Sequence, residues 1–312
     1  MSERVQVTHF ADPGCPWDYS AEPVRVALEQ RYGEQLAWRN DQVGVYESAA
    51  TAAARGYTTA GQAESYRIFQ ERHGMPFCTK ERPRLQGTWP AARAVKAAER
   101  QGRPLGAALL RRLRLAWFVE GRILDPEDEL LHVAAQVAGL DLTDFAADLE
   151  SEVSARALER DMQEARHPGP VALGLEKTSQ PTGELSPRYS TPTYRFTFED
   201  RSVVVPGFQP LAAYEVALHN LHPEIERRAV PDAAGFLRAH PGEPYATVEV
   251  AAAIGRSPRT TSGQLAALLD EGAVTRTRPG AGELWSWGPP AFDLRCRTRP
   301  HLDERLEHEL AA

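Results

Sequence analysis

The first forty residues alternate between apolar and polar side chains in a pattern typical of a strand, a helix and a second strand. Residues 5–10 alternate at period two and are rich in β-branched side chains, which predicts a strand. Apolar side chains then recur at helical spacing as far as Tyr32, and Pro23 inside that helix should kink it. Residues 36–40 predict a second strand, parallel to the first across the helix, in a right-handed βαβ unit.

Between about residues 59 and 166 the apolar positions recur every three or four residues, which predicts a block of helices. The predicted helices cover residues 59–73, 89–101, 105–118, 126–138 and 144–166. We expect this helical insertion to form a lid over one edge of the sheet. The run Arg111-Arg112-Leu113-Arg114 is interpreted as the solvated face of one of its helices.

Prolines and glycines are frequent in residues 167–190, which predicts a linker made of turns. Residues 194–198 and 202–205 then alternate and are joined by a turn at Glu199 and Asp200, so they predict an antiparallel hairpin. A helix over residues 211–221 is expected to cover the sheet.

The C-terminal residues 229–290 predict a helix, a second helix, a turn, a third helix and a two-stranded hairpin. This order is typical of a winged helix-turn-helix. Across residues 230–288 there are five Arg and no Lys against six Asp and Glu, a weak electrostatic basis for binding DNA. We therefore expect a protein partner or a homodimer contact through this unit ahead of DNA. Residues 291–312 predict a mixed-charge tail in which Cys296 has no particular role.

Composition limits the classes of protein to consider. With 312 residues, 42% apolar and 25% charged, and a formal net charge of −7, the chain predicts two domains, residues 1–228 and 229–290. No apolar run reaches the ~20 residues of a membrane span and no apolar leader precedes the first strand, so we expect no membrane association and a cytoplasmic location. The three cysteines lie far apart and predict neither a disulfide framework nor a metal site, which suits a reducing compartment.

The candidate chemistry centres on Cys15, which lies in the segment DPGCPWD (residues 12–18) at the turn from the first strand into the helix. The free N–H groups and the dipole at a helix N-terminus favour thiolate over thiol. From the residues alone two interpretations stay open, a nucleophilic or redox cysteine and a small apolar side chain under a turn.

The order of these features resembles the thioredoxin fold of the DsbA family, and most closely the branch that includes FrnE-like oxidoreductases and 2-hydroxychromene-2-carboxylate isomerases. Three stretches carry the resemblance: the turn at residues 12–17, the end of the helical insertion between residues 117 and 166, and the loop Thr191-Pro192-Thr193. The match spans about residues 4–222. It implies an α/β thioredoxin-like fold with a helical insertion, followed here by a small winged-helix-like domain.

The resemblance also implies roles for individual residues. Cys15 would be the catalytic nucleophile, with Asp18 modulating it, and the substrate-binding residues would be Pro16, Trp17, Thr191 and Pro192. The family holds the proline of this loop cis, which is chemically sensible at an X–Pro bond, and the backbone beside it pairs with an extended substrate. One departure matters: the redox members have Cys-X-X-Cys, and here Asp18 occupies the second cysteine position, so no disulfide can form within the turn.

Three functions are compatible with this departure. The first expectation is a monothiol thiol–disulfide oxidoreductase, in which the charge of Asp18 partly cancels the effect of the helix on the pKa of Cys15, and Cys78 is a candidate resolving thiol. The second is an isomerase or transferase that uses glutathione as co-substrate, with no other cofactor. The third is a non-catalytic adaptor, whose partner groove would be lined by Trp17, Trp89, Trp117 and Phe118. For Trp117 and Phe118, packing in the core of the lid is the more economical explanation.

Overall fold

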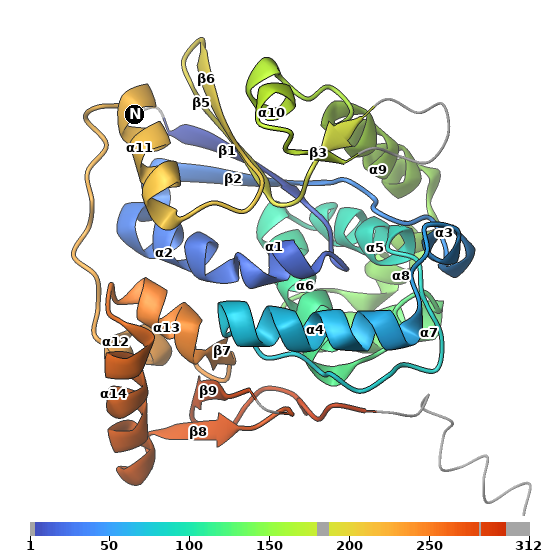
Figure 1. Cartoon of the computed structure of the whole chain (residues 1–312). Helices are drawn as coiled ribbons and strands as arrows, with labels where there is room; N and C mark the ends of the chain where they lie inside the picture. Colours follow the sequence, from blue (N-terminus) through green and yellow to red (C-terminus); the bar gives the residue numbers. More distant parts are fainter. Residues whose placement is uncertain (1–3, 180–186, 281, 298–312) are drawn as a thin grey trace, which may run out of the picture.

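The centre of the molecule is a four-stranded mixed sheet (Figure 1). The computed structural model describes residues 4–179, 187–280 and 282–297. The strands follow the order β2-β1-β5-β6, with bounds β1 Val5–Ala11, β2 Leu36–Gln42, β5 Thr193–Phe198 and β6 Arg201–Pro206. Strand β1 pairs parallel with β2 and antiparallel with β5, which in turn pairs antiparallel with β6. The predicted strands, the parallel pair and the hairpin are therefore confirmed.

Helices cover both faces of this sheet. On one face α2 (Glu22–Tyr32) and α11 (Leu211–Leu221) pack over a core that includes Val7, Leu28, Phe196 and Leu218. On the other face α9 (Glu152–Ala165) and α10 (Pro170–Gly174) pack near Phe10. Because alternate residues of a strand point to opposite faces, β1 contributes Val7 to one core and Phe10 to the other.

The first predicted helix is not kinked but divided. Helix α1 (Pro16–Ser20) ends at Ala21, and α2 starts at Glu22 with Pro23 in its first turn. A proline there sacrifices no helical hydrogen bond, because the first N–H groups of a helix have no partner within it. The expectation that Pro23 lies inside one continuous helix is therefore wrong.

The helical insertion lies beside the sheet and contains α3 Ala49–Ala54, α4 Thr59–His73, α5 Trp89–Glu99, α6 Arg103–Arg114, α7 Glu127–Ala134 and α8 Leu142–Glu150. Helix α6 continues into a π-helical segment, η2 (Leu115–Glu120). The helix predicted over residues 144–166 is two helices, α8 and α9, because Ser151 leaves helical geometry and its side chain caps α9 by accepting from the Ser154 N–H.

The segment predicted as a linker contains α10 and the short strands β3 (Thr178–Ser179) and β4 (Arg188–Tyr189), which pair antiparallel. Its residues 180–186 lie outside the described part of the chain. A short 3₁₀ turn, η1 (Gly33–Gln35), joins α2 to β2.

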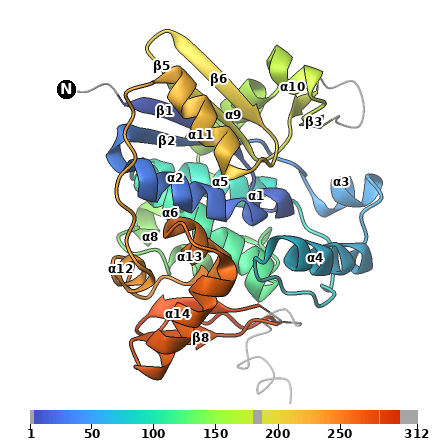
Figure 2. The same ribbon diagram turned by 60° about the vertical axis from the view of Figure 1, so that its left-hand side comes forward.

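The C-terminal part packs against α2 and the helical insertion (Figure 2). It comprises α12 Ala233–Arg238, β7 Tyr245–Ala246, α13 Thr247–Ala253, α14 Pro258–Asp270, β8 Val274–Thr277 and β9 Leu284–Trp287. The three strands form an antiparallel sheet in the order β7-β9-β8. Val26 of α2 joins the core of this part, together with Phe236 and Trp285.

The residues that follow β9 are not a free tail as far as the structure describes them. Leu294 is buried and belongs to the same core as Leu109 and Phe118 of the helical insertion. The remainder of the predicted tail, residues 298–312, lies outside the described residues.

Cys78 and Cys296 form a disulfide; their Cα atoms are 5.3 Å apart, although the two residues are separated by 218 positions in sequence. The expectations that the cysteines make no disulfide and that Cys296 has no particular role are therefore wrong. Sequence spacing gave no signal, because the fold brings together two segments from opposite ends of the chain. None of the described helices combines the length and the apolarity that crossing a membrane requires.

Candidate functional site

The turn that carries Cys15 is built on the carboxylate of Asp12. This carboxylate accepts hydrogen bonds from the N–H of Gly14 at 2.8 Å, from the N–H of Val45 at 2.8 Å and from Oγ1 of Thr88 at 2.9 Å. Burial raises the pKa of Asp12 above its usual value, although these hydrogen bonds oppose the rise. Gly14 is required sterically, since a Cβ there would lie 2.7 Å from atoms of Thr88 and Trp117.

Cys15 is the N-cap residue of α1 and lies against the loop that contains Pro192. Its Sγ donates a hydrogen bond to the carbonyl oxygen of Thr191 at 3.7 Å, across 176 positions of sequence. The Thr191–Pro192 peptide bond is cis. The structure thus brings together Cys15, Pro16 and Thr191, which the sequence singled out from two distant segments.

The Cys15 side chain is only 9% exposed. Burial, followed by the negative charge of Asp18, raises the pKa of Cys15 to about 11. The expected balance between the helix N-terminus and Asp18 is wrong, because desolvation of the thiolate outweighs what a five-residue helix contributes. At neutral pH Cys15 is therefore a thiol.

Asp18 does not face the pocket as a free carboxylate but lies in a buried ion-pair cluster. It contacts Nε2 of His9 at 2.8 Å, pairs with the guanidinium of Arg114 and accepts the N–H of Asp12 at 2.9 Å. Burial alone would raise the pKa of Asp18, but Arg114 and His9 lower it below its usual value. Asp18 is therefore an anion at neutral pH and is fixed in place.

The arginines of α6 supply the cations of this cluster. Arg114 is 1% exposed and pairs with both Asp18 and Glu22, while Arg112 is buried and pairs with Glu120. The interpretation of residues 111–114 as a solvated face is therefore wrong. The apolar run from Leu115 to Val119 was the available signal, because a helix that is apolar on all sides is buried together with its charges.

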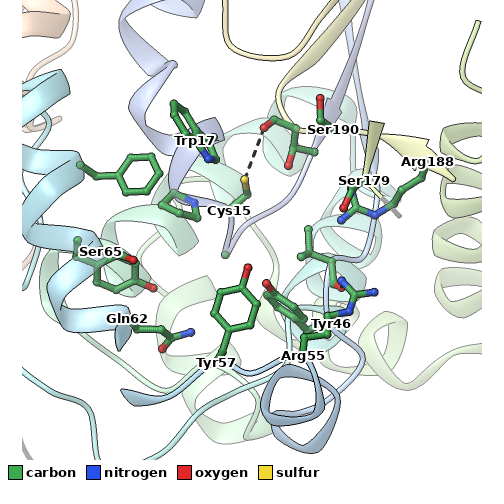
Figure 3. A pocket seen from close by; sticks show the side chains of 16 residues that line it. Cys15, Trp17, Tyr46, Arg55, Tyr57, Gln62, Ser65, Ser179, Arg188 and Ser190 are labelled. Atoms are coloured by element: carbon green, nitrogen blue, oxygen red, sulfur yellow. Dashed lines mark hydrogen bonds between the residues drawn. The ribbon is translucent and has the colours of Figure 1, made fainter. Parts of the chain in front are cut away.

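Cys15 opens into a pocket of about 370 Å³ between the turn, the helical insertion and the Pro192 loop (Figure 3). Its polar lining includes residues that carry no motif in sequence, namely Tyr46, Arg55, Tyr57, Gln62, Ser179, Arg188 and Ser190. The sequence missed them because these seven residues are spread over four separate segments of the chain. Only the tertiary structure places them around one thiol.

The four aromatic residues proposed for a partner groove do not lie together. Trp17 is 45% exposed at the rim of the pocket, with its ring 4.8 Å from that of Phe69 and 5.9 Å from that of Phe208. Trp117 and Phe118 are buried in the core of the insertion. Trp89 is half-buried and donates its indole N–H to the carbonyl of Gly44 at 3.0 Å, away from this pocket.

Cys78 is not a partner for Cys15, because it is bonded to Cys296. Within residues 4–179, 187–280 and 282–297, no group of His, Cys, Asp and Glu side chains has the arrangement of a metal site.

Comparison with known proteins places this site in context. A family model described as thioredoxin matches residues 9–169, slightly more than half of the chain. Two solved structures share the fold. One is described as a protein disulfide isomerase from Nitrosomonas europaea, with a TM-score of 0.54 and 15% identity over 70% of this chain and 97% of its own. The other is a probable DsbA oxidoreductase from Streptomyces coelicolor, with a TM-score of 0.51 and 19% identity over 74% of this chain and 95% of its own.

Curated relatives match by sequence, and each is named ClpXP adapter protein SpxH. The protein of Bacillus subtilis is 29% identical over 222 residues, or 70% of this chain and 67% of that protein. The protein of Halalkalibacterium halodurans is 34% identical over 167 residues, which cover 51% of this chain and 53% of that protein, so the match spans about half of that relative. The protein of Shouchella clausii is 26% identical over 294 residues, which cover 91% of this chain and 88% of that protein. This similarity extends into the C-terminal part.

Proposed function

This chain belongs to the thioredoxin family, and we propose that it acts as a protein-binding adapter that brings another protein to the ClpXP protease. The observation that carries the proposal is the state of Cys15, which is buried, hydrogen-bonded and kept as a thiol by a pKa of about 11. Thiol–disulfide exchange requires a thiolate. A family member with a protonated thiol at this position is better suited to binding than to exchange.

The absence of a resolving thiol near Cys15 supports the same function. Asp18 occupies the second position of the motif and is committed to His9 and Arg114. Cys78, the other candidate, is bonded to Cys296. The site keeps the geometry for holding an extended segment beside Thr191 but lacks the second half of a redox cycle.

The named relatives support an adapter role from an independent direction. Similarity to a ClpXP adapter protein over most of both chains includes the C-terminal part, which a catalytic thioredoxin domain alone would not require. We infer that residues 229–290 form a winged-helix-like unit that contacts protein rather than DNA. In the β8–β9 hairpin, Arg276 and Arg278 share the carboxylate of Glu283, which neutralises one of their two charges and weakens the attraction to phosphates.

The test is to measure protein half-lives in cells with and without this chain, and then to reconstitute the effect with purified ClpXP and the protein that accumulates. An adapter should accelerate degradation of that protein, and the Cys15→Ser variant should do so as well as the unchanged chain. If no half-life depends on the chain, or if Cys15→Ser abolishes the acceleration, the adapter proposal is wrong.

A second candidate is a monothiol oxidoreductase of the FrnE-like branch, with glutathione or another thiol completing the reaction. It is favoured by the contact of Cys15 with the carbonyl of Thr191 beside a cis proline, a geometry in which Pro16, Trp17 and Pro192 would hold the substrate. Reduction of a mixed disulfide that Cys15→Ser eliminates would identify this activity.

A further inference from the structure

The pocket beside Cys15 is lined by two guanidinium groups and, among the described residues around it, by no carboxylate. Arg188 comes from β4 and Arg55 follows α3. Figure 3 shows the side chains of Arg55 and Arg188 around the same pocket as Cys15. The pocket therefore carries a net positive charge in a small, partly enclosed space.

Arg188 is the more unusual of the two. It is 5% exposed, and its Nη1 donates a hydrogen bond to the carbonyl oxygen of Tyr189 at 2.8 Å. No described carboxylate lies within ion-pair distance of it. A buried charge without an anionic partner is costly, and structures normally supply that partner.

The acid that most influences Arg188 is already used elsewhere. Asp12 favours the charged form of Arg188 through space, but its oxygens accept from Gly14, Val45 and Thr88. Asp12 is also fully buried and is not one of the residues that line the pocket. Among the described residues, no carboxylate is therefore left to pair with Arg188.

Arg55 extends the same positive wall. Its Nη1 donates to the carbonyl of Val45 at 3.4 Å and its guanidinium stacks 5.4 Å from the centre of the Tyr46 ring, while Nε is buried without a hydrogen-bond partner. Arg55 and Arg188 repel each other because both are positively charged. An anion between them would offset this repulsion.

We propose that this pocket is a binding site for a carboxylate-bearing ligand of dipeptide or tripeptide size, whose carboxylate pairs with Arg188 and Arg55. Guanidinium groups match carboxylates in a planar, bidentate geometry, and a pocket of about 370 Å³ is at the small end of ligand sites. The apolar part of the ligand packs against Trp17, Phe69 and Tyr57.

The inference does not depend on the adapter role. The carboxylate has two possible sources, a free small acid and the C-terminal end of a bound protein chain. Binding of either is measured on the isolated chain, without ClpXP, so failure here and failure of the adapter proposal are separate results.

The experiment is calorimetric titration of the full chain without added reductant, so that the Cys78–Cys296 disulfide stays intact, with two probes and their carboxamides. S-Methylglutathione represents a free small acid, and N-acetyl-glycyl-glycyl-phenylalanine represents a chain end. At least one acid should bind, its carboxamide should bind roughly 10- to 100-fold more weakly, and Arg188→Gln should produce a loss of similar size, as expected for a charge-assisted hydrogen bond. The probe that binds identifies the source.

Two further variants keep the test decisive. Arg55 is half-buried, so Arg55→Gln should fold and weaken binding of the same probe even if Arg188→Gln fails to fold. Arg156 is 68% exposed on α9, and Arg156→Gln should leave binding unchanged. If neither acid binds, if acid and carboxamide bind equally, or if both Arg55→Gln and a folded Arg188→Gln bind like the unchanged chain, the site assignment is wrong.

Discussion

At the scale of the residue, Cys15 illustrates how burial decides the chemistry of a thiol. Its position as an N-cap residue favours the thiolate, but a helix of five residues provides little stabilisation. Desolvation and the neighbouring anion Asp18 act in the opposite direction and dominate. The same thiol in the same turn would be reactive if it were exposed and its neighbour neutral.

The pH dependence of Cys15 alkylation measures the pKa of its thiol. With a pKa of about 11, its thiolate fraction at pH 7 is roughly 100-fold below that of an ordinary cysteine. We expect the rate of modification by iodoacetamide, followed by mass spectrometry, to rise steadily from pH 7 to pH 10. Because the folded state raises this pKa, it also loses stability as the pH rises from about 9 towards 11. The denatured chain is the control, and rapid modification of the native chain at pH 7 contradicts the prediction.

Asp18→Asn tests the contribution of the neighbouring charge. Removing the anion should lower the pKa of Cys15 and move the alkylation profile to lower pH, since Asp18 is the largest cause of the shift after burial. It should also reduce the free energy of unfolding by roughly 3 kcal/mol, because Arg114 loses a buried partner. Asp144→Asn, at an exposed position of α8, is the matched control and should change neither quantity.

At the scale of the element, α6 is held by ion pairs that its sequence does not suggest. Arg114 reaches Asp18 in α1 and Glu22 in α2, so one side chain fixes the helical insertion against both helices behind the thiol turn. Its neighbour Arg111 contacts Glu249 of α13 at 2.8 Å. Helix α6 therefore links the thiol turn to the C-terminal part.

Replacing Arg114 by Met should be strongly destabilising. The substitution leaves two buried carboxylates without their cation, and we expect a loss of about 3–5 kcal/mol in the free energy of unfolding, measured by urea denaturation. Arg156→Met removes an exposed pair with Glu152 in α9 and should cost less than about 1 kcal/mol. Equal effects of the two substitutions would refute the buried cluster.

The disulfide between Cys78 and Cys296 should stabilise the fold by constraining the unfolded chain. Cys296→Ser should lower the free energy of unfolding by about 2–4 kcal/mol, because the closed loop is long. The loss should disappear when both proteins are compared under strong reductant. Thiol counting by mass spectrometry on the native chain should find one free thiol, Cys15, and finding three would show that the bond is absent.

At the scale of the whole molecule, the C-terminal part and the remainder share cores. Val26 of α2 is buried among residues of α12 and α13, and Ala246, Leu284 and Leu294 complete the core of the helical insertion. Arg111 and the fully buried Glu249 add a partly buried ion pair across the same boundary. The packing is more extensive than two domains joined by a linker would need.

A chain that ends at residue 228 tests this packing. It exposes Val26 and the apolar face of the insertion and leaves Arg111 without Glu249, so we expect stronger binding of a hydrophobic dye and a loss of at least about 3 kcal/mol in stability. A truncated chain as stable as the full one would indicate that residues 229–290 are an independent domain.

The sequence by itself determined the local structure of this protein. Period-two and helical patterns located the central strands and most helices, and the order of the turn at Cys15 and the loop at Pro192 indicated the α/β fold of the family, because these features depend on neighbours in the chain. Only the tertiary structure decided what depends on distant residues: the burial of Cys15, the partners of Arg114, the bond of Cys78 to Cys296, and the meeting of Arg55 with Arg188. Charge state and reactivity follow from desolvation and from through-space partners, and neither is encoded in local spacing.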